Sequence, residues 1–446
     1  ITNTYQNNMK KSILILAMSI VSFSFAQNKQ WTLKECVDHA IENNISVKQS
    51  QYNTLTNEEN LKASRGQFLP SLGASFSQSV SFGNAELFPG SFVDRTFHSS
   101  SASINVSQTI FNGFRTTNLY KQSKLNLEQS ELELARIKDD ISLNVVNSYL
   151  NILFNKENLN TALFQLEFSR KQFKRIQELV DSGVSPKGDL LNIEATMAND
   201  EQQVIAAENS LNLAKLGLAQ LLQISSSDFD VVNVVVDEPS EIFLYENSNS
   251  IYIIAEEERN EIKSAEKAIE ISELGTVISK AGYMPTLSFG YGFNSGANFS
   301  NLSSSNSFVQ QMNDNKGHNL SLRLNIPIFS RFQNQTSVSK SKIQEEKAKL
   351  NLEQAKLTLY DNIERAFLDV KSALKSYEAS KKSLDAQVLS LENTQGRFSI
   401  GMANAFDLDQ ERTKLVNAKA SLTKAKYDFV FKTKVLDFYA GKSLLD

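Results

Sequence analysis

The stretch SLGASFSQSVSF, residues 71–82, alternates strictly between small polar and larger side chains. Its odd positions are all serine or glycine, and its even positions are apolar except for Gln78. Because successive side chains of a strand point to opposite faces, this pattern predicts a strand with one polar and one apolar face. The pattern recurs in three further segments, at residues 101–110, 287–293 and 320–328.

Two environments fit these alternating strands. A half-buried strand of a soluble sandwich shows the same alternation. However, the segments are about ten residues long, as a tilted strand that crosses a bilayer must be, and a face of serine, glycine, threonine and asparagine suits a water-filled lumen. We therefore predict four membrane-spanning strands, which pair across polar loops at 83–97 and 296–317. Four phenylalanines are expected near the strand ends, where an aromatic girdle would lie: Phe82, Phe111, Phe293 and Phe329.

Two long stretches, residues 115–180 and 332–399, contain no proline and predict uninterrupted helices. Apolar residues in both follow the four-three spacing of a coiled coil. In the first stretch, the predicted seam comprises Val145, Tyr149, Ile152, Leu159, Leu163, Leu166, Phe173 and Val180, with Lys156 and Arg170 at two of its positions. In the second, it includes Ile363, Val370, Leu374, Tyr377, Leu384 and Val388. A helix of some 65 residues would reach about 100 Å, so we expect an elongated protein.

The chain also contains an internal duplication, since Phe68-Leu69-Pro70 is answered by Tyr283-Met284-Pro285 and Ser182-Gly183 by Ile400-Gly401. The first repeat is predicted at 27–223, with a β-hairpin at about 68–112 and a coiled-coil hairpin at about 115–223. The second is predicted at 257–446, with a β-hairpin at about 284–330 and a coiled-coil hairpin at about 332–440. Residues 224–256 connect the two repeats.

We predict that residues 1–26 comprise a secretory signal peptide and a few residues that precede it. Met9-Lys10-Lys11 precedes an apolar run at 13–25, and Ser24-Phe25-Ala26 provides small residues for cleavage after Ala26. An N-terminal membrane anchor is the alternative interpretation, but the run is several residues shorter than the roughly 20 that are needed to cross a bilayer. Cys36 is the only cysteine, which excludes an intrachain disulfide, and we expect it to pack on a helix face.

Charge and motifs exclude several other classes of function. The net charge of −4 provides no basic field for nucleic acid. The three histidines lack metal-ligand spacing, and HExxH and GxSxG motifs are absent from the sequence. Residues 183–188 resemble the start of a phosphate loop, but Asp189 stands where lysine is required. We therefore predict neither an enzyme nor a cofactor.

Four strands cannot close a membrane barrel on their own. An open sheet edge in hydrocarbon leaves backbone groups unpaired, at a cost of several kcal/mol each. Membrane barrels begin at about eight strands, so two chains would suffice, while three would give about twelve strands. These residues alone leave the number of chains open.

In the order of its motifs, the chain resembles the TolC or outer membrane factor family. Residues 31–44 resemble the family's opening helix, residues 66–70 and 281–285 resemble the two starts of its β-barrel, and Ile400-Gly401-Met402 resembles a helical tip. The resemblance implies an α+β membrane protein with two internal repeats. It further implies a homotrimer, in which a twelve-stranded outer membrane β-barrel, four strands per chain, continues into a long periplasmic α-helical barrel. Residues 224–256 would form the equatorial belt.

The function implied by the resemblance is that of a passive exit duct in a tripartite efflux pump or a type I secretion system. The duct would lie in the outer membrane of a Gram-negative bacterium. It would receive substrate from an inner membrane transporter of the RND, ABC or MFS type through a periplasmic adaptor, or membrane fusion, protein. The alternative is a soluble periplasmic coiled-coil scaffold, which explains the heptads but not the four alternating strands.

The long helices should end at Gly183 and Gly401, because glycine readily takes the left-handed conformation that terminates a helix. Ser185-Pro186 predicts a cap followed by the first residue of the returning helix, and Asn404 with Asp407 predicts a capping-box-like start. The resemblance implies that these turns contact the adaptor. The contact residues would be Ser182, Gly183, Val184, Ile400, Gly401 and Met402.

The resemblance also implies that Asp407 belongs to an acidic ring at the constriction of the duct. Three symmetry-related carboxylates would repel one another and attract cations. An aspartate in the first turn of a helix is equally ordinary, because it complements the helix dipole. Ala403 stands where the family's pattern has an arginine, and Gln410 where it has a second aspartate, so the gate network of this chain departs from that pattern.

Overall fold

The computed structural model describes residues 30–227, 229–234, 245 and 247–442. The predicted signal peptide and part of the connecting segment 224–256 lie outside these residues. The chain divides into two compact units. The first combines the residues up to Lys48 with Ile137–Ala255 and the chain from Asp361 onward, and the second combines Gln49–Arg136 with Glu256–Tyr360.

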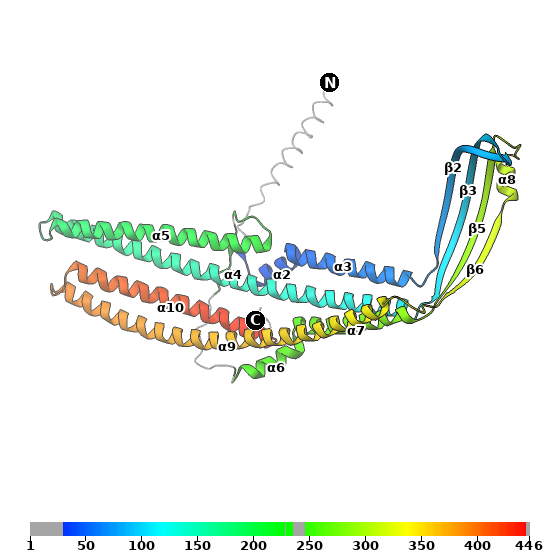
Figure 1. Ribbon diagram of the computed structural model, residues 1–446. Helices are drawn as coiled ribbons and strands as arrows, with labels where there is room; N and C mark the ends of the chain where they lie inside the picture. Colours follow the sequence, from blue (N-terminus) through cyan, green and yellow to red (C-terminus); the bar gives the residue numbers. More distant parts are fainter. Residues whose placement is uncertain (1–29, 228, 235–244, 246, 443–446) are drawn as a thin grey trace, which may run out of the picture. The chain divides into compact units, whose positions relative to one another are not determined.

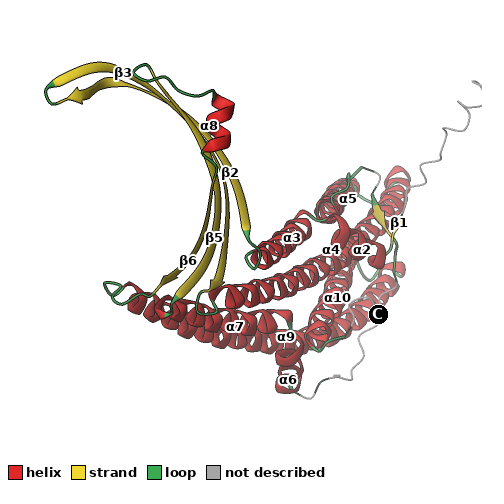
Figure 2. Ribbon diagram, turned by 90° about the vertical axis from the view of Figure 1, so that its right-hand side faces the viewer, coloured by secondary structure: helices red, strands yellow, loops and turns green. Residues whose placement is uncertain are grey.

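The second unit contains a four-stranded antiparallel sheet with the strand order β2-β3-β5-β6. The strands are β2 (Ser71–Phe88), β3 (Ser91–Phe111), β5 (Thr286–Ser300) and β6 (Gly317–Asn325). They bend together into a strongly curved sheet (Figure 2). Thus β3 of the first repeat pairs with β5 of the second, and β2 and β6 form the two outer edges.

The strand register produces the two faces that the alternation at residues 71–82 predicts. One row of the apolar face contains Leu72, Val106, Tyr291 and Leu320. The neighbouring row, on the polar face, contains Ser71, Ser107, Gly290 and Ser321. Three serine pairs across β2 and β3 are hydrogen-bonded through their hydroxyls at 2.7–2.8 Å. The apolar face stays open to solvent in the single chain, where Leu72 is 74% and Leu320 71% exposed.

The first hairpin is longer than predicted. The strands β2 and β3 continue through the expected loop 83–97, and Gly90 occupies the turn between them with a φ of 84°. Phe82 pairs with Thr96 inside the hairpin, and Phe293 lies in the middle of β5, opposite the second residue of β6, His318. Neither phenylalanine is therefore near an end of its own strand, contrary to the expectation. Backbone pairing continues beyond residue 82 although the side-chain alternation weakens there.

The second hairpin differs from the prediction at both ends. The strand β6 ends at Asn325 rather than at 328, because Pro327 lacks the N–H that a ladder needs. The expected loop 296–317 contains the end of β5 and a short helix, α8 (Phe308–Asp314), which Ser307 caps. This helix lies against the sheet, where the Ser295 hydroxyl donates to the Met312 carbonyl and the Asn315 amide to the Gly296 carbonyl at 2.7 Å.

Four helices adjoin the same end of the sheet, where β2 and β5 start and β3 and β6 end. The helix α3 (Ile45–Gly66) precedes β2, and α7 (Asn260–Lys280) with a 3₁₀ turn at Ala281–Tyr283 precedes β5. The long helices α4 (Arg115–Asp181) and α9 (Gln333–Ser399) follow β3 and β6. The side chains of α7 contact both long helices, because Lys267 pairs with Glu128 of α4 at 3.2 Å and Thr276 bonds Glu345 of α9 at 3.3 Å.

The first unit consists mainly of two helical hairpins (Figure 1). In one, α5 (Lys187–Leu222) returns along α4, and in the other α10 (Ala405–Tyr439) returns along α9. Arg170 of α4 pairs with Glu201 of α5, and Ser390 of α9 donates to Glu411 of α10. Among the described residues, the structure contains no helix that is both long and apolar enough to cross a membrane.

Smaller elements complete this unit. They are α2 (Leu33–Asn43), α6 (Ser248–Glu258) and a parallel pair of short strands, β1 (Gln30–Trp31) and β4 (Asp230–Val231). Cys36 is fully buried on α2, as expected for a residue on a packed helix face.

The predicted heptad seam of α4 is only partly correct. Val145, Tyr149 and Ile152 are buried as expected, but Leu163 is exposed and so is the side chain of Arg170, at 58%. Buried Ser169 takes the interior place instead. The reason is that this part of α4 packs against both α5 and α10, so a single stripe cannot describe its buried surface.

Lys156, which interrupts the predicted seam, has a structural role. Its ammonium group donates to the Val231 carbonyl at 2.7 Å and lies 2.9 Å from the carboxylate of Asp230. Lys215 of α5 approaches the same carboxylate at 3.1 Å. Burial raises the pKa of Asp230, but hydrogen bonds from Lys156, the Val231 backbone and Lys215 outweigh it, so the pKa lies below its usual range. Two lysines from two helices therefore fasten strand β4.

Replacing Asp230 by asparagine should lower the thermal stability of the detergent-solubilised protein at pH 7. The two lysines would lose their counter-ion, at a cost of about 1–3 kcal/mol. Because the folded pKa is depressed, the stabilisation is present above the unfolded value of about 4 and disappears as the pH falls through the folded value. Circular dichroism melting should therefore show a difference from wild type that narrows below about pH 4.

The matched control is Glu167→Gln, which breaks the exposed pair between Glu167 and Lys171 on one turn of α4. It should leave the melting temperature nearly unchanged. Equal effects of the two substitutions would contradict the assigned role of Asp230.

Candidate functional site

The turn between α4 and α5 is closed by a glycine, as expected. Gly183 has a φ of 75°, its N–H donates to the Val180 carbonyl at 3.0 Å, and the Val184 N–H donates to the Leu179 carbonyl at 2.8 Å. These two bonds form a Schellman motif, which satisfies the last carbonyls of the helix. The Ser182 hydroxyl adds a bond to the Glu178 carbonyl at 2.9 Å. Val184 is left largely exposed at the tip.

The turn between α9 and α10 repeats this geometry. Gly401 also has a φ of 75°, and its N–H and that of Met402 donate to the carbonyls of Phe398 and Arg397 at 3.1 and 2.8 Å. Ile400 and Met402 are exposed on either side of the glycine. The duplicated sequence pattern therefore gives two turns with the same backbone conformation and exposed apolar side chains.

The returning helices begin differently from each other. Asn404 and Asp407 form the predicted capping box, since the Asp407 N–H donates to the Asn404 side chain at 2.8 Å and the Asn404 N–H to the Asp407 carboxylate at 3.2 Å. The prediction for Ser185 was wrong by one residue. Pro186 itself has the extended conformation of the cap position, with no side-chain cap, and α5 starts at Lys187.

The structure does not join the three predicted gate residues to one another. Among the described residues, the hydrogen bonds of Asp407 are those with Asn404, and none connects it to Ala403 or Gln410. Gln410 is exposed and Ala403 is half-buried. In the single chain, Asp407 therefore stabilises the start of α10, and any gate role would require other copies of the chain.

A buried charge cluster near these turns was not predicted. Arg412 of α10 is only 4% exposed. Its guanidinium lies 2.8 Å from the carboxylate of Asp409 and 3.5 Å from that of Asp200 on α5, and it donates to the Ser169 hydroxyl of α4 at 3.0 Å. Ser169 in turn bonds Asp200, and the ring of Phe168 lies beneath the guanidinium at 5.1 Å. One arginine thus ties α10 to both helices of the other hairpin.

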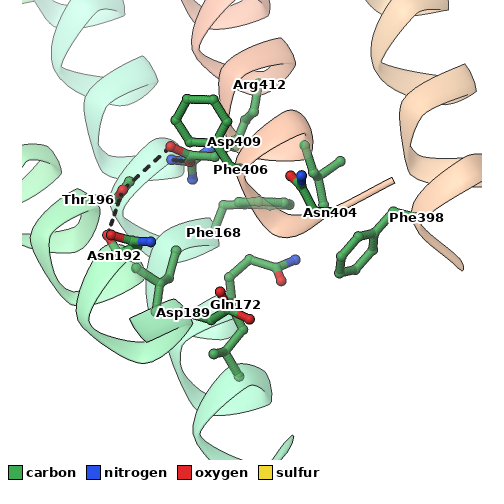
Figure 3. A pocket seen from close by; sticks show the side chains of 13 residues that line it. Phe168, Gln172, Asp189, Asn192, Thr196, Phe398, Asn404, Phe406, Asp409 and Arg412 are labelled. Carbon is green, nitrogen blue, oxygen red and sulfur yellow. Dashed lines mark hydrogen bonds and ion pairs between the residues drawn. The ribbon is translucent and has the colours of Figure 1, made fainter. Parts of the chain in front are cut away.

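A cavity of about 380 Å³ lies beside this cluster (Figure 3). Aromatic side chains of three helices line it together with polar groups, and Thr196 lies 3.5 Å from the Asp409 carboxylate at its wall. The lining includes Phe168, Gln172, Asp189, Asn192, Phe398 and Phe406. The cavity lies between the α4–α5 hairpin and the α9–α10 hairpin, close to their turns.

The sequence pattern indicates a buried ion pair at this cluster. Arg412 lies four residues after Leu408 and three before Leu415, and Asp200 lies three after Met197 and four before Val204. Both therefore occupy seam positions of the heptad pattern, where a charge is costly unless it is paired. Two seam charges of opposite sign on different helices predict an ion pair, although which helices meet cannot be read from spacing alone.

Comparison with known proteins identifies the family. Residues 36–222 and 252–441 match the outer membrane efflux protein family, and the chain belongs to this family. Over 334 residues it is 21% identical to outer membrane protein TolC of Vibrio cholerae, covering 74% of each sequence.

Solved structures show the same fold. The chain superimposes on CusC with a TM-score of 0.78 at 18% identity, covering 94% of this chain and 96% of CusC. The CmeC outer membrane channel of Campylobacter jejuni gives 0.75 at 18% identity, with 93% and 85% covered. The open state of the Neisseria gonorrhoeae MtrE outer membrane channel gives 0.73 at 17% identity, with 92% and 89% covered. The TolC-like fold class predicted from the sequence is therefore confirmed.

Replacing Arg412 by methionine should strongly destabilise the hairpin contact. The substitution leaves the buried carboxylate of Asp200 without its cation, which costs about 3–5 kcal/mol in comparable buried pairs. Adding Asp200→Leu should recover much of that loss, because an apolar replacement of a buried pair is often neutral and the carboxylate that remains, Asp409, is 32% exposed. Thermal unfolding of the single and double variants measures both effects.

Arg170→Met is the matched control, because Arg170 also links α4 to α5 but through an exposed pair with Glu201. Its cost should stay below about 1 kcal/mol. The assignment fails if Arg412→Met proves as mild as this control.

Proposed function

We propose that this chain is the outer membrane channel of a tripartite efflux pump or a type I secretion system. In this proposal it is a passive exit duct, which performs no chemistry and receives substrate from an inner membrane transporter of the RND, ABC or MFS type. Membership of the outer membrane efflux protein family supports the proposal. The observation that carries it is the open, two-faced sheet.

The two outer strands of this sheet have unpaired edges. Within the described chain, β2 pairs only with β3, and β6 only with β5. The apolar face is largely exposed, and the opposite face is lined by serine, glycine and asparagine. Closure with neighbouring copies would satisfy the edges, turn the apolar face to lipid and surround water with the polar face.

A homotrimer fits this requirement, because three chains provide about twelve strands, well above the minimum of about eight for a membrane barrel. The same threefold arrangement would place three copies of each helical hairpin around the axis. The resemblance to TolC-like channels supports three rather than two chains.

The turns at Gly183 and Gly401 are the proposed contact with the periplasmic adaptor. Val184, Ile400 and Met402 expose apolar surface there, and the two Schellman motifs hold the backbone in one conformation. A rigid turn with exposed apolar side chains binds a helical hairpin without first having to become ordered. Ser182 borders the same surface.

Extraction and conductance measurements test the proposed function. Outer membranes should yield the protein only with detergent, as a trimer that dissociates on heating, and the purified trimer should form ion-conducting pores in planar bilayers. Release by osmotic shock, without pore formation, would favour a soluble periplasmic scaffold and contradict the proposal.

In the proposed trimer, the three Asp407 carboxylates form the acidic ring at the constriction, and Ala403 and Gln410 do not contribute to it. Asp407→Asn keeps an oxygen that can accept the N-cap bond but removes three charges from the trimer. It should therefore weaken the block of single-channel current by divalent cations at least severalfold without lowering the frequency of pore formation. Unchanged block would show that the carboxylate serves only the capping box.

A further inference from the structure

The polar face of the sheet is almost free of charge. From the row of Gly83 and Arg95 to the row of Thr286 and Asn325, the register places on it serine, glycine, asparagine and threonine. The exceptions are Phe97 and two arginines, Arg95 and Arg323. None of these described rows contains a carboxylate on this face. The polar face therefore has a net positive charge.

Arg323 lies near the helix-proximal end of this face. It is in β6, where it pairs with Ser288 of β5, and its neighbours Leu322 and Leu324 are exposed on the apolar face. The alternation of β6 therefore fixes the arginine on the polar side. Arg323 is exposed, and the structure gives it no ion pair within the described residues.

The residues around Arg323 are small. The next row contains Gly290 opposite Ser321, and a Cβ at Gly290 would come within 2.7 Å of the Ser321 hydroxyl. The third residue in its own row is Thr109. Among the three residues paired in this described row, Arg323 has the only long side chain, while Gln67 and Arg115 line a pocket together with Thr109 and Ser288.

Arg95 differs in its surroundings. It lies near the far end of the β2–β3 hairpin, and its guanidinium is 4.4 Å from the centre of the Phe97 ring. The nearby carboxylates, Glu86 and Asp94, have the opposite register parity, and Glu86 accepts a bond from the Gly90 N–H at 2.7 Å. Of the two arginines, Arg323 is therefore the one that stands among small neutral residues.

We propose that Arg323 gives the membrane part of the channel a preference for anions. This inference rests on the proposed function, in which three copies close the sheet around water and place three Arg323 guanidinium groups at one level. Small anionic solutes are then concentrated at that level, neutral ones pass without preference, and cationic ones are depleted.

The size of a twelve-stranded barrel makes the effect measurable. Strands about 4.8 Å apart and tilted by about 40° give a backbone radius of about 12 Å. The Debye length is about 10 Å at 0.1 M salt and about 3 Å at 1 M. The field of the Arg323 ring therefore extends across the lumen at the lower salt concentration and is screened at the higher one.

Reversal potentials of trimers in planar bilayers test the proposal. In a tenfold KCl gradient with 0.1 M on the concentrated side, Arg323→Gln should lower the chloride-to-potassium permeability ratio at least twofold. Arg323→Glu should lower it further, and Arg323→Lys should leave it near wild type. The differences should shrink when the concentrated side is raised to 1 M. The change from wild type is decisive, because the proposed Asp407 ring acts with the opposite sign.

Lys316→Gln is the matched control. Lys316 lies in the loop between α8 and β6. Its replacement by glutamine removes the same charge per chain as Arg323→Gln but leaves the polar face unaltered. Its permeability ratio should equal that of wild type. A shift as large as that of Arg323→Gln would overturn the inference, since overall charge would then explain both.

Chemical modification changes the charge at position 323 after the channel has folded and opened, so that misfolding of a variant cannot explain the result. In a Cys36→Ser background, Arg323→Cys should respond to a cationic methanethiosulfonate reagent with a higher chloride-to-potassium ratio and to an anionic one with a lower ratio. Conducting channels whose ratio moves with neither reagent would overturn the role of Arg323 and leave the proposed duct intact. Wild-type protein that forms no pores would overturn the duct and this inference with it.

Discussion

The unpaired backbone along the outer edges of β2 and β6 is the constraint on which the remaining architecture depends. Each unsatisfied N–H or C=O group in hydrocarbon costs several kcal/mol, which is far more than the stabilisation that a single side-chain contact provides. Within the described residues this sheet has no fifth strand, and its apolar face is open. In the proposed channel, neighbouring copies satisfy these edges, so folding of the membrane part and assembly become one process. The small residues of the polar face follow from the same closure, because that face must border water.

Paired charges perform a comparable task in the helical unit. Lys156 and Lys215 fasten β4 through Asp230, and Arg412 joins α10 to Asp200. An unpaired charge at either place would be costly, and the pairs therefore fix which helices meet and in what register. Apolar heptads alone supply attraction with little specificity. The Arg412 contact between the two hairpins can thus hold the exposed turns in place. The cavity between the hairpins lies beside this contact.

Much of the fold could be predicted because it repeats simple periods. The alternation at 71–82 indicated a two-faced strand, and the absence of proline indicated both long helices within a residue or two of their observed ends. The hairpin beyond Gly83 was missed because backbone pairing does not require alternating side chains, and α8 was missed because it is short and polar. The capping box was readable, since its partners are three residues apart. The seam positions of Arg412 and Asp200 indicated an ion pair, but the partners of Arg412 could not be predicted, because they are separated from it by up to 243 positions and meet it only through tertiary packing.

Disulfide crosslinking between the two sheet edges of neighbouring copies tests the central claim most directly. In a Cys36→Ser background, one cysteine is placed on β2 at Ser75 or Ser77 and another on β6 at Asn319 or Ser321. Both edges lie at the outside of the sheet. If neighbouring copies close the barrel, at least one combination should yield linked dimers and trimers in outer membranes, with the trimer as the largest product. Chains that remain monomeric for every combination along both edges would contradict the account.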